Sequence, residues 1–198
     1  PVLEVWGLLP AVAAITSRVR IGPLVSPTTV HHPALLANRA AAIDRVSNGR
    51  FVLGMGAGWQ INEHRAYGFD LPAAGERVSR FEEGIQIVRS MLDEPRTSFA
   101  GRHFTITDAP NDPGPVQQRL PILVGTGSPR MLRITARHAD EWNTWGSPPT
   151  VRDRLADLHR ACESVGRDPA TIHTTAQPLV VLCDDEATAA SARERADA

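Results

Sequence analysis

Apolar residues recur every three or four positions in several stretches of this chain, a spacing typical of amphipathic helices. The helices that this spacing predicts cover residues 4–16, 33–47, 78–93, 128–139 and 151–166, and a further helix begins near residue 184. Shorter apolar runs predict buried strands within residues 20–27, 51–59, 120–127, 140–146 and 173–182. Helices and strands therefore alternate along the chain.

Residues with special backbone preferences support several of these boundaries. Pro33 suits the first position of a helix, because it lacks the N–H group that would stay unpaired there. Asn48 and Gly49 suit the left-handed turn that ends a helix. Ser128 and Thr150 each stand at the start of a predicted helix, where a hydroxyl oxygen can cap a backbone N–H group.

Alternating strands and helices predict an α/β fold with a parallel sheet and right-handed crossovers. We expect a single domain over residues 1–198 with an irregular insertion at 94–119, where proline and glycine are frequent and one alternating piece suggests a short hairpin. Periodicity alone does not distinguish part of a (β/α)8 barrel from an open, doubly wound sheet.

Composition and charge narrow the classes of function. The formal net charge is −1, which favours neither nucleic acid nor a membrane surface as a partner. All 21 basic residues are arginine, so a Schiff-base lysine is excluded. Cys162 and Cys183 lack metal or redox spacing, and no apolar run is long enough to span a membrane. We expect a soluble, cytoplasmic protein that binds a small molecule.

In both architectures a ligand binds at the carboxyl ends of the strands, so the residues that follow each apolar run are the candidates. These are residues 23–29, 56–63, 125–130 and 142–146. Most of these stretches consist of small residues, hydroxyl groups and tryptophan. Paired carboxylates for acid–base catalysis and a Ser-His-Asp set are missing, so no catalytic residue is assigned. The composition suits a flat, partly apolar ligand with a phosphate tail.

Two glycine-rich motifs each have two interpretations. In "GTGS", residues 125–128, backbone N–H groups at a helix N-terminus would bind a phosphate with help from Thr126, Ser128 and Arg130, or Ser128 would simply cap a tight turn. In "GMGAGW", the backbone would receive a planar ring, or the glycines would only allow close packing. Trp59, which ends this motif, would stack on a ligand or belong to the core.

Several histidine and acidic residues have simpler structural interpretations. His31 and His32 stand at the start of a helix, where capping or a solvated loop explains them. His138, Asp140 and Glu141 are too close in sequence to match a known metal-binding set. No metal site is predicted.

The start of the helix predicted over 78–93 carries Arg77, Arg80 and Glu83 close together. Opposite charges three or four residues apart form ion pairs on a helix surface. We interpret this set as structural ion pairs.

Together, several stretches resemble the luciferase-like monooxygenase superfamily, and most closely its branch that uses the deazaflavin coenzyme F420. The stretches are "RIGPLVSP", "HPALLANRAAAIDRVSNGRFVLGMGAGW", "RFEEG", "LPILVGTG" and "ADEWNTW". The second is the most specific, because its helix length, stop signal and glycine loop all match. The resemblance extends from Glu4 to about Leu182.

The resemblance implies a (β/α)8 TIM barrel in which the predicted strands are the third to the seventh. A full barrel needs about 250 residues, so an incomplete barrel of strands 3 to 7 is expected. In this family the second strand usually brings polar groups to the active site. The family also commonly has a non-proline cis peptide at the end of the third strand, which would fall here at Pro23–Leu24.

The resemblance further implies three groups of cofactor contacts. At the end of the third strand, the flavin or deazaflavin ring would lie against Leu24, Val25 and Ser26. From the fourth strand it would meet Ala57, Gly58 and Trp59. Its phosphate would be held by Gly125, Thr126, Gly127 and Ser128.

The leading hypothesis is therefore an oxidoreductase that uses F420 for hydride transfer with a small organic substrate. An alternative on the same fold binds FMN and activates oxygen as a monooxygenase, and another is a non-catalytic binding module or inactive barrel fragment. Some sugar-phosphate-oxidising members carry a catalytic glutamate where this chain has Trp59, which disfavours that specific activity. Residues 94–119 are expected to shape substrate specificity, and a homodimer through the barrel-wall helices is plausible in this superfamily.

Overall fold

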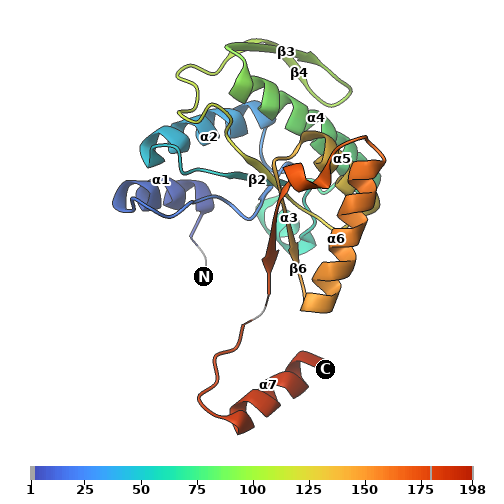
Figure 1. Cartoon of the computed structure of the whole chain (residues 1–198). Coiled ribbons are helices and arrows are strands. Elements are labelled where there is room, and N and C mark those ends of the chain that lie inside the picture. Colours follow the sequence, from blue (N-terminus) through green and yellow to red (C-terminus); the bar gives the residue numbers. More distant parts are fainter. Residues whose placement is uncertain (1–2, 179, 198) are drawn as a thin grey trace.

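The computed structural model describes residues 3–178 and 180–197 (Figure 1). Within these residues, five parallel strands form one sheet in the order β1-β2-β5-β6-β7. The strands are β1 (Ser26–Pro27), β2 (Leu53–Gly56), β5 (Ile122–Gly125), β6 (Glu141–Trp145) and β7 (His173–Gln177). Each lies within a predicted strand, so the α/β fold with a parallel sheet is confirmed. Within the described residues the sheet stays open at β1 and β7, as an incomplete barrel requires.

Helices surround the sheet, and one helix lies apart from it (Figure 1). They are α1 (Val5–Ile15), α2 (Pro33–Ser47), α3 (Ile61–Tyr67), α4 (Ala74–Asp93), α5 (Pro129–His138), α6 (Pro148–Glu163) and α7 (Glu186–Asp197). A short 3₁₀ helix, η1 (Pro169–Thr171), precedes β7. Figure 1 shows α7 at the end of an extended segment that leaves the sheet after β7.

The first strand is much shorter than predicted. Of the predicted stretch 20–27, only the two residues of β1 pair regularly with β2, and Ile21 adds an isolated bridge to Phe51. Pro23 interrupts the run because proline has no N–H group to donate to the ladder. A non-proline cis peptide is present, but it joins Leu24 to Val25 and not Pro23 to Leu24 as predicted. The regular ladder begins directly after this bond.

The last strand also ends earlier than predicted. The sequence pattern extends it to Leu182, whereas β7 ends at Gln177. Pro178 follows, and it cannot donate a hydrogen bond to a neighbouring strand. Leu179, which belongs to the predicted strand, lies outside the described residues.

The predicted helix boundaries are confirmed at α2. Pro33 is its first residue, and Asn48 and Gly49 adopt the left-handed conformation that ends it, with φ of 53° and 80°. Ser128 is the N-cap residue of α5 as predicted, whereas the predicted cap of α6 is wrong. Ser128 precedes α5 but its side chain makes no capping bond, and Thr150 lies inside α6, which already starts at Pro148.

Helix α3 was not predicted, because only His64 of its residues is buried and no apolar stripe marks it. The insertion at 94–119 contains the predicted hairpin. Its strands are β3 (Arg96–Ala100) and β4 (Thr105–Pro110), which pair antiparallel, and the hairpin lies against α4.

The main core forms where α2 and α4 pack against β2 and β5. Leu36, Phe81 and Ile85 from the helices and Leu53 and Ile122 from the strands have no exposed surface. Burial of each such side chain contributes about 1.5–3 kcal/mol to folding. This packing gives the carboxyl ends of the strands a rigid base.

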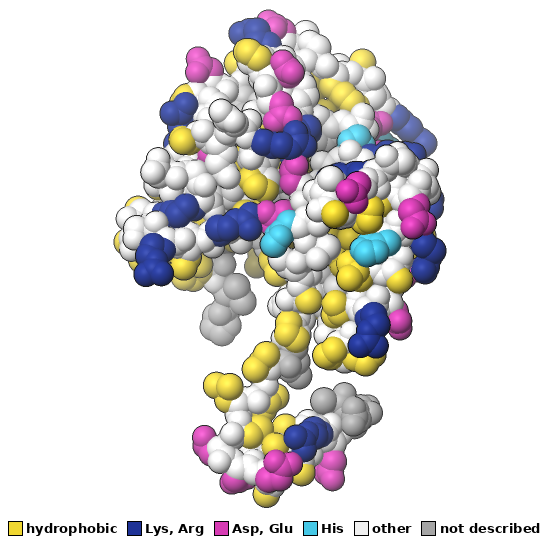
Figure 2. All heavy atoms as spheres, in the orientation of Figure 1, with side chains coloured by type: hydrophobic (Ala, Val, Ile, Leu, Met, Phe, Trp, Pro, Cys, Tyr) yellow, Lys and Arg dark blue, Asp and Glu magenta, His cyan; other side chains and the backbone are white. Residues whose placement is uncertain are grey.

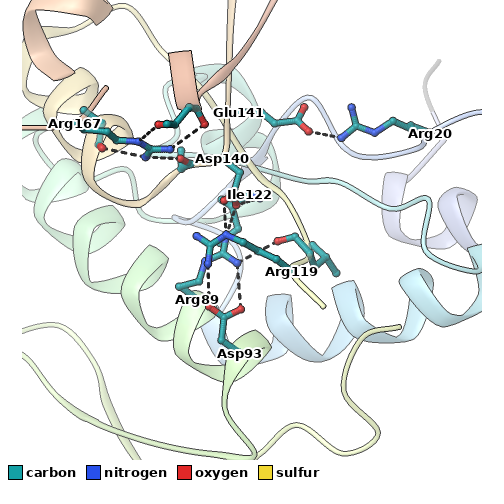
Figure 3. A network of polar contacts seen from close by, with 12 residues as sticks. Arg20, Arg89, Asp93, Arg119, Ile122, Asp140, Glu141 and Arg167 are labelled. Carbon is teal, nitrogen blue, oxygen red and sulfur yellow. Dashed lines mark hydrogen bonds and ion pairs between the residues drawn. The ribbon is translucent and has the colours of Figure 1, made fainter. Parts of the chain in front are cut away.

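A polar network ties α4 to the amino-terminal ends of β5 and β6 (Figure 3). The Asp140 carboxylate forms an ion pair with Arg89, accepts a hydrogen bond from Arg119 Nε at 2.7 Å, and accepts another from the Ile122 N–H at 2.9 Å. Asp93 pairs with both arginines. In barrels of this kind the amino-terminal face serves stability, while the carboxyl face carries chemistry.

The visible surface in Figure 2 intersperses basic and acidic side chains, in keeping with the near-zero net charge. Hydrophobic side chains gather on the segment that leads to α7, where Val180 and Leu182 are exposed. Among the described residues, no helix combines the length and the apolar character that crossing a membrane would need.

Candidate functional site

The structure brings the three predicted groups of site residues to neighbouring strand ends. The sheet order places β1 beside β2 and β2 beside β5, and all three strands run parallel. The register sets Pro27 opposite Gly56 and Gly125 opposite Asn143. Residues 24–26, 57–59 and 125–128 therefore border one edge of the sheet, and their role in holding a cofactor stays a prediction.

Val25 fills the space in front of the glycines at this edge. A Cβ atom at Gly56 would lie 2.8 Å from Val25 Cγ2, and one at Gly125 would lie 3.3 Å from Val25 Cγ1. A Cβ atom at Gly54 would collide with the carbonyl oxygen of Pro23. The close-packing interpretation therefore accounts for these glycines, since they make room for the segment before β1.

Large apolar side chains are exposed around this edge. Trp59 is 75% exposed and so does not belong to the core, which removes one of its two interpretations. Leu24, which precedes β1, and Trp145, the last residue of β6, are 55% and 68% exposed, although β2 and β5 separate their strands. Apolar groups gathered at strand ends are typical of a surface that contacts a ligand.

Buried hydroxyl groups without partners lie at the end of β1. Ser26 and Thr28 are only 2% and 3% exposed, and neither hydroxyl oxygen has a hydrogen-bond partner among the described residues. Leaving a buried polar group unpaired costs about 1–3 kcal/mol. The polar edge of a ring system is one group that would satisfy such hydroxyls.

The hydroxyl of the neighbouring Thr29 forms a hydrogen bond with His64, a residue that sequence reasoning missed. His64 Nδ1 donates to the Gln60 carbonyl oxygen at 2.7 Å, because a carbonyl oxygen can only accept. Its Nε2 lies 2.8 Å from Thr29 Oγ1. The buried imidazole thus holds the loop after β1 against α3, and only a tertiary contact reveals this, since α3 itself carries no strong sequence signal.

The "GTGS" loop leaves the N-terminus of α5 without a side-chain cap. The N–H of Thr126 approaches the Asn143 carbonyl oxygen at 3.4 Å, and the N–H of Ser128 approaches Thr126 Oγ1 at 3.3 Å. In the described part of the chain, the N–H of Gly127 has no acceptor. Gly127 is exposed, so its free N–H group is open to a ligand.

The arginine beside this loop is not the one that the sequence suggests. Arg130 turns toward α4, where it donates to the Gly75 carbonyl oxygen and to Ser79 Oγ, both at 3.0 Å. Arg154 of α6 lies next to the loop instead, with Nε 3.7 Å from the position of a Cβ atom at Gly127. Sequence reasoning missed it because α6 follows a different strand.

Contacts from β6 hold the Arg154 guanidinium in place. It donates to Thr144 Oγ1 at 3.0 Å and to the Trp145 carbonyl oxygen at 2.7 Å, and it lies 5.0 Å from the centre of the Trp145 ring. No carboxylate of the described residues is within ion-pair distance of it. The charge is therefore oriented without being neutralised, as an anion-binding site requires.

The remaining candidates behave structurally. The His32 imidazole caps α2, since its Nδ1 accepts the N–H of Ala34 at 3.3 Å. His138 is half-buried at the end of α5, where burial is the main cause that lowers its pKa. Among the described residues, no three histidine, cysteine or acidic side chains are arranged to hold a metal ion. A cavity of about 290 Å³ lies between α5 and α6, away from the strand ends.

Comparison with known proteins places this geometry in a family. The family model described as luciferase-like monooxygenase matches residues 2–197. The chain belongs to the luciferase-like monooxygenase family.

Two curated relatives have sequences similar to this chain. An F420-dependent glucose-6-phosphate dehydrogenase of Kineococcus radiotolerans is 32% identical over 193 residues, which cover 96% of this chain and 56% of the relative. A pyrimidine monooxygenase RutA of Acinetobacter baylyi is 33% identical over 176 residues, which cover 85% of this chain and 47% of the relative. The chain spans about half the length of the curated relatives it matches.

A solved structure of the same fold supports the architecture. The F420-dependent tetrahydromethanopterin reductase of Methanopyrus kandleri superposes with a TM-score of 0.84 at 21% identity, covering 93% of this chain and 57% of that protein. At this identity the likeness establishes the fold alone. The expectation of a luciferase-like TIM-barrel architecture from strands 3 to 7 is thereby confirmed.

Proposed function

We propose that this chain binds coenzyme F420 and acts as an oxidoreductase that exchanges a hydride with a small organic substrate. The observation that carries the proposal is the uncapped N-terminus of α5, which opens beside the unneutralised Arg154 guanidinium. When bound, the deazaflavin supplies or accepts the hydride, and the protein supplies binding and orientation. Relatives named as F420-dependent support this choice of cofactor.

The phosphate of the cofactor would lie on the "GTGS" loop. Free N–H groups and the helix dipole favour an anion at the start of α5. Arg154, which lies beside Gly127, would add a charge-assisted hydrogen bond. Three features of the loop suit this role: an unpaired N–H at Gly127, an uncapped helix and exposure to solvent.

The ring would lie at the ends of β1 and β2. The unpaired hydroxyls of Ser26 and Thr28 fit the polar edge of a pyrimidine-like ring. Leu24 and Trp59 are exposed and would shield the ring from water. The residues present therefore fit a flavin-type group. Val25 would support the ring from below, where it already covers the strand glycines.

Two other functions have specific support. FMN-dependent oxygen chemistry is the alternative on the same fold, and the relative named pyrimidine monooxygenase favours it. A non-catalytic binding role remains the alternative from a different class, because no acid–base residue is identified at the strand ends of the described chain. Trp59 continues to argue against sugar-phosphate oxidation. Self-association as a homodimer and a cytoplasmic location stay predictions.

Direct titration of the protein with oxidised F420 and, separately, with FMN tests the proposal. We expect quenching of F420 fluorescence at concentrations where FMN does not bind. Tight FMN binding without F420 binding would replace the proposal by the monooxygenase alternative. Binding of neither cofactor to the properly folded chain would favour the non-catalytic role.

A further inference from the structure

A small cavity opens beside the end of β1, next to the place that the proposed function gives to the cofactor ring. Its volume is about 240 Å³. Sites for drug-sized ligands measure about 300–1,000 Å³, so this cavity suits a small molecule or one group of a larger one. We call it the Arg80 pocket, and it is lined by Arg80, Phe69, Phe104 and the segment from Thr28 to His32.

Arg80 brings an unpaired charge to this pocket. Its guanidinium lies 5.2 Å from the centre of the Phe104 ring, and the residue is only partly exposed. In the described chain, no carboxylate lies within ion-pair distance of Arg80 and no oxygen accepts a hydrogen bond from it. A partly buried guanidinium without partners is poorly compensated for its lost hydration. All its N–H donors are therefore available to a ligand.

The acid expected to pair with Arg80 is engaged elsewhere. The Glu83 carboxylate accepts the N–H groups of Arg102, His103 and Phe104 at 2.8, 2.8 and 3.1 Å. The sequence-based interpretation of an ion pair at this helix start is therefore wrong for Glu83. Its hydrogen bonds with the hairpin turn hold Phe104 in the pocket wall and leave Arg80 without a counter-ion.

His32 offers a second donor. Because its Nδ1 accepts the N–H of Ala34, the proton of the neutral imidazole sits on Nε2. Among the described residues, Nε2 has no partner, and the ring meets the Phe104 ring edge-on at 5.6 Å. Nearby, Arg39 contacts His31 Nδ1 at 3.3 Å and adds a further positive charge. The pocket thus combines cationic and N–H donors with aromatic walls.

The pocket shares a wall with the candidate cofactor site. Thr29 lines the pocket, and a Cβ atom at Gly58 would collide with Thr29 Oγ1, so the loop after β2 packs directly on this residue. Thr28, whose buried hydroxyl has no partner, also lines the pocket. A molecule in the pocket would therefore lie next to a ring held at the ends of β1 and β2.

We propose that the Arg80 pocket binds the anionic group of the substrate, and that the substrate is a small organic acid or phosphate ester. The inference rests on the proposed function, since it takes the neighbouring edge as the cofactor site. Guanidinium binds carboxylate and phosphate with two parallel hydrogen bonds, and Nε2 of His32 supplies a third donor. The apolar body of the substrate packs against Phe69 and Phe104.

Titration calorimetry with benzoate, phenyl phosphate and the neutral analogue benzamide tests the pocket, using the full chain without cofactor. We expect one or both anions to bind at least about tenfold more tightly than benzamide, as the loss of a charge-assisted contact predicts. A preference for benzoate assigns a carboxylic acid, and a preference for phenyl phosphate assigns a phosphate ester. Equal binding of benzamide overturns the proposal.

Two arginine variants test whether the anion binds in the Arg80 pocket. Arg80→Met keeps the stem that packs on Phe104 and removes the charge, and it should weaken anion binding at least about tenfold. Arg102→Met removes the same charge from the nearby hairpin turn, outside the pocket, and should change affinity by less than about twofold. Equal losses of anion affinity in both variants would show that the anion responds to the overall positive charge of this surface, and would overturn the site. If Arg80→Met does not fold, the amide resonances of His32 and Phe104 in the unaltered protein test the site instead. Shifts of these resonances on anion addition support binding in the Arg80 pocket, and their absence overturns it.

A parallel titration with F420 separates this inference from the proposed function. F420 binding without any anion binding overturns the pocket and leaves the proposed function standing. Anion binding without F420 or FMN binding overturns the substrate role, because the neighbouring cofactor would be absent. Tighter anion binding in the presence of F420 supports both.

Discussion

At the scale of single residues, the function of an arginine depends on what it already contacts. Arg130 adjoins the "GTGS" loop in sequence, yet its donors are bound to α4. Arg154 is distant in sequence, yet it lies beside Gly127 with no carboxylate of the described chain to neutralise it. A charge without a counter-ion is the one that an anion can use.

Replacing Arg154 by alanine should weaken F420 binding by about tenfold to a hundredfold, since a hydrogen bond to a charged group is worth about 1.5–3 kcal/mol. Arg130→Ala is the matched control and should leave the affinity within about twofold. Fluorescence titration of both variants measures this difference. If Arg130→Ala has the larger effect, the phosphate lies elsewhere.

Gly127 and Gly125 should respond differently to valine. A side chain at Gly127 would meet Arg154 only at ordinary contact distance, so Gly127→Val should fold normally and block the phosphate position. A side chain at Gly125 would press on Val25, so Gly125→Val should lower the melting temperature as well. Melting curves and F420 titrations separate the two effects. Unchanged cofactor affinity in Gly127→Val would support the interpretation of the "GTGS" motif as a tight turn without a role in phosphate binding.

At the scale of elements, one side chain attaches the hairpin to α4. Glu83 accepts backbone N–H groups from three consecutive residues of the turn between β3 and β4. Burial acts to raise the pKa of this carboxyl, but the three hydrogen bonds together outweigh it, and the pKa lies below its ordinary value of 4.5. The ionised form therefore stabilises the attachment.

Glu83→Gln should lower the free energy of unfolding by about 1–3 kcal/mol at neutral pH, because it removes the charge and an acceptor from this turn. Since the folded pKa is depressed, the contribution is complete above the ordinary pKa of 4.5 and is lost as the pH falls through the lowered pKa. Urea unfolding at pH 7 and pH 3 measures it. Glu82→Gln, which breaks only surface ion pairs at 3.5 and 3.6 Å, should cost less than about 1 kcal/mol. Equal costs for the two variants would contradict this assignment.

At the scale of the whole molecule, the two ends of the sheet differ in how their polar groups are paired. At the amino-terminal end, a network of ion pairs with Asp140 at its centre joins α4 to β5 and β6 (Figure 3). The carboxyl end carries unpaired hydroxyls, an uncapped helix and unneutralised arginines. This contrast is what the division between stability and chemistry predicts for a barrel of this kind.

Asp140→Ala should lower the free energy of unfolding by about 2–4 kcal/mol, because it leaves the largely buried Arg89 charge without its main partner. Asp108→Asn removes the exposed ion pair with Arg96 and should cost about 0–1 kcal/mol. Chemical unfolding followed by circular dichroism compares them. F420 binding at a temperature where both variants are folded should stay unchanged, and a selective loss in Asp140→Ala would argue against a purely structural role.

The sequence by itself determined the elements and their order. Apolar patterns located the five strands of the main sheet and the α-helices other than α3, and the turn residues Pro33, Asn48 and Gly49 placed the limits of α2, because these preferences act within a few residues. The same local signals failed at β1, where a proline breaks the ladder, and at the start of α6.

Only the tertiary structure decided which side chains meet at the strand ends. Arg154 reaches the "GTGS" loop from another helix, His64 bonds Thr29 from α3, and Glu83 leaves Arg80 unpaired by turning to the hairpin. These pairings join residues far apart in the chain, and each depends on how helices pack over the sheet. Periodicity carries no record of that packing, because it reports which face of an element is buried and not what the face touches.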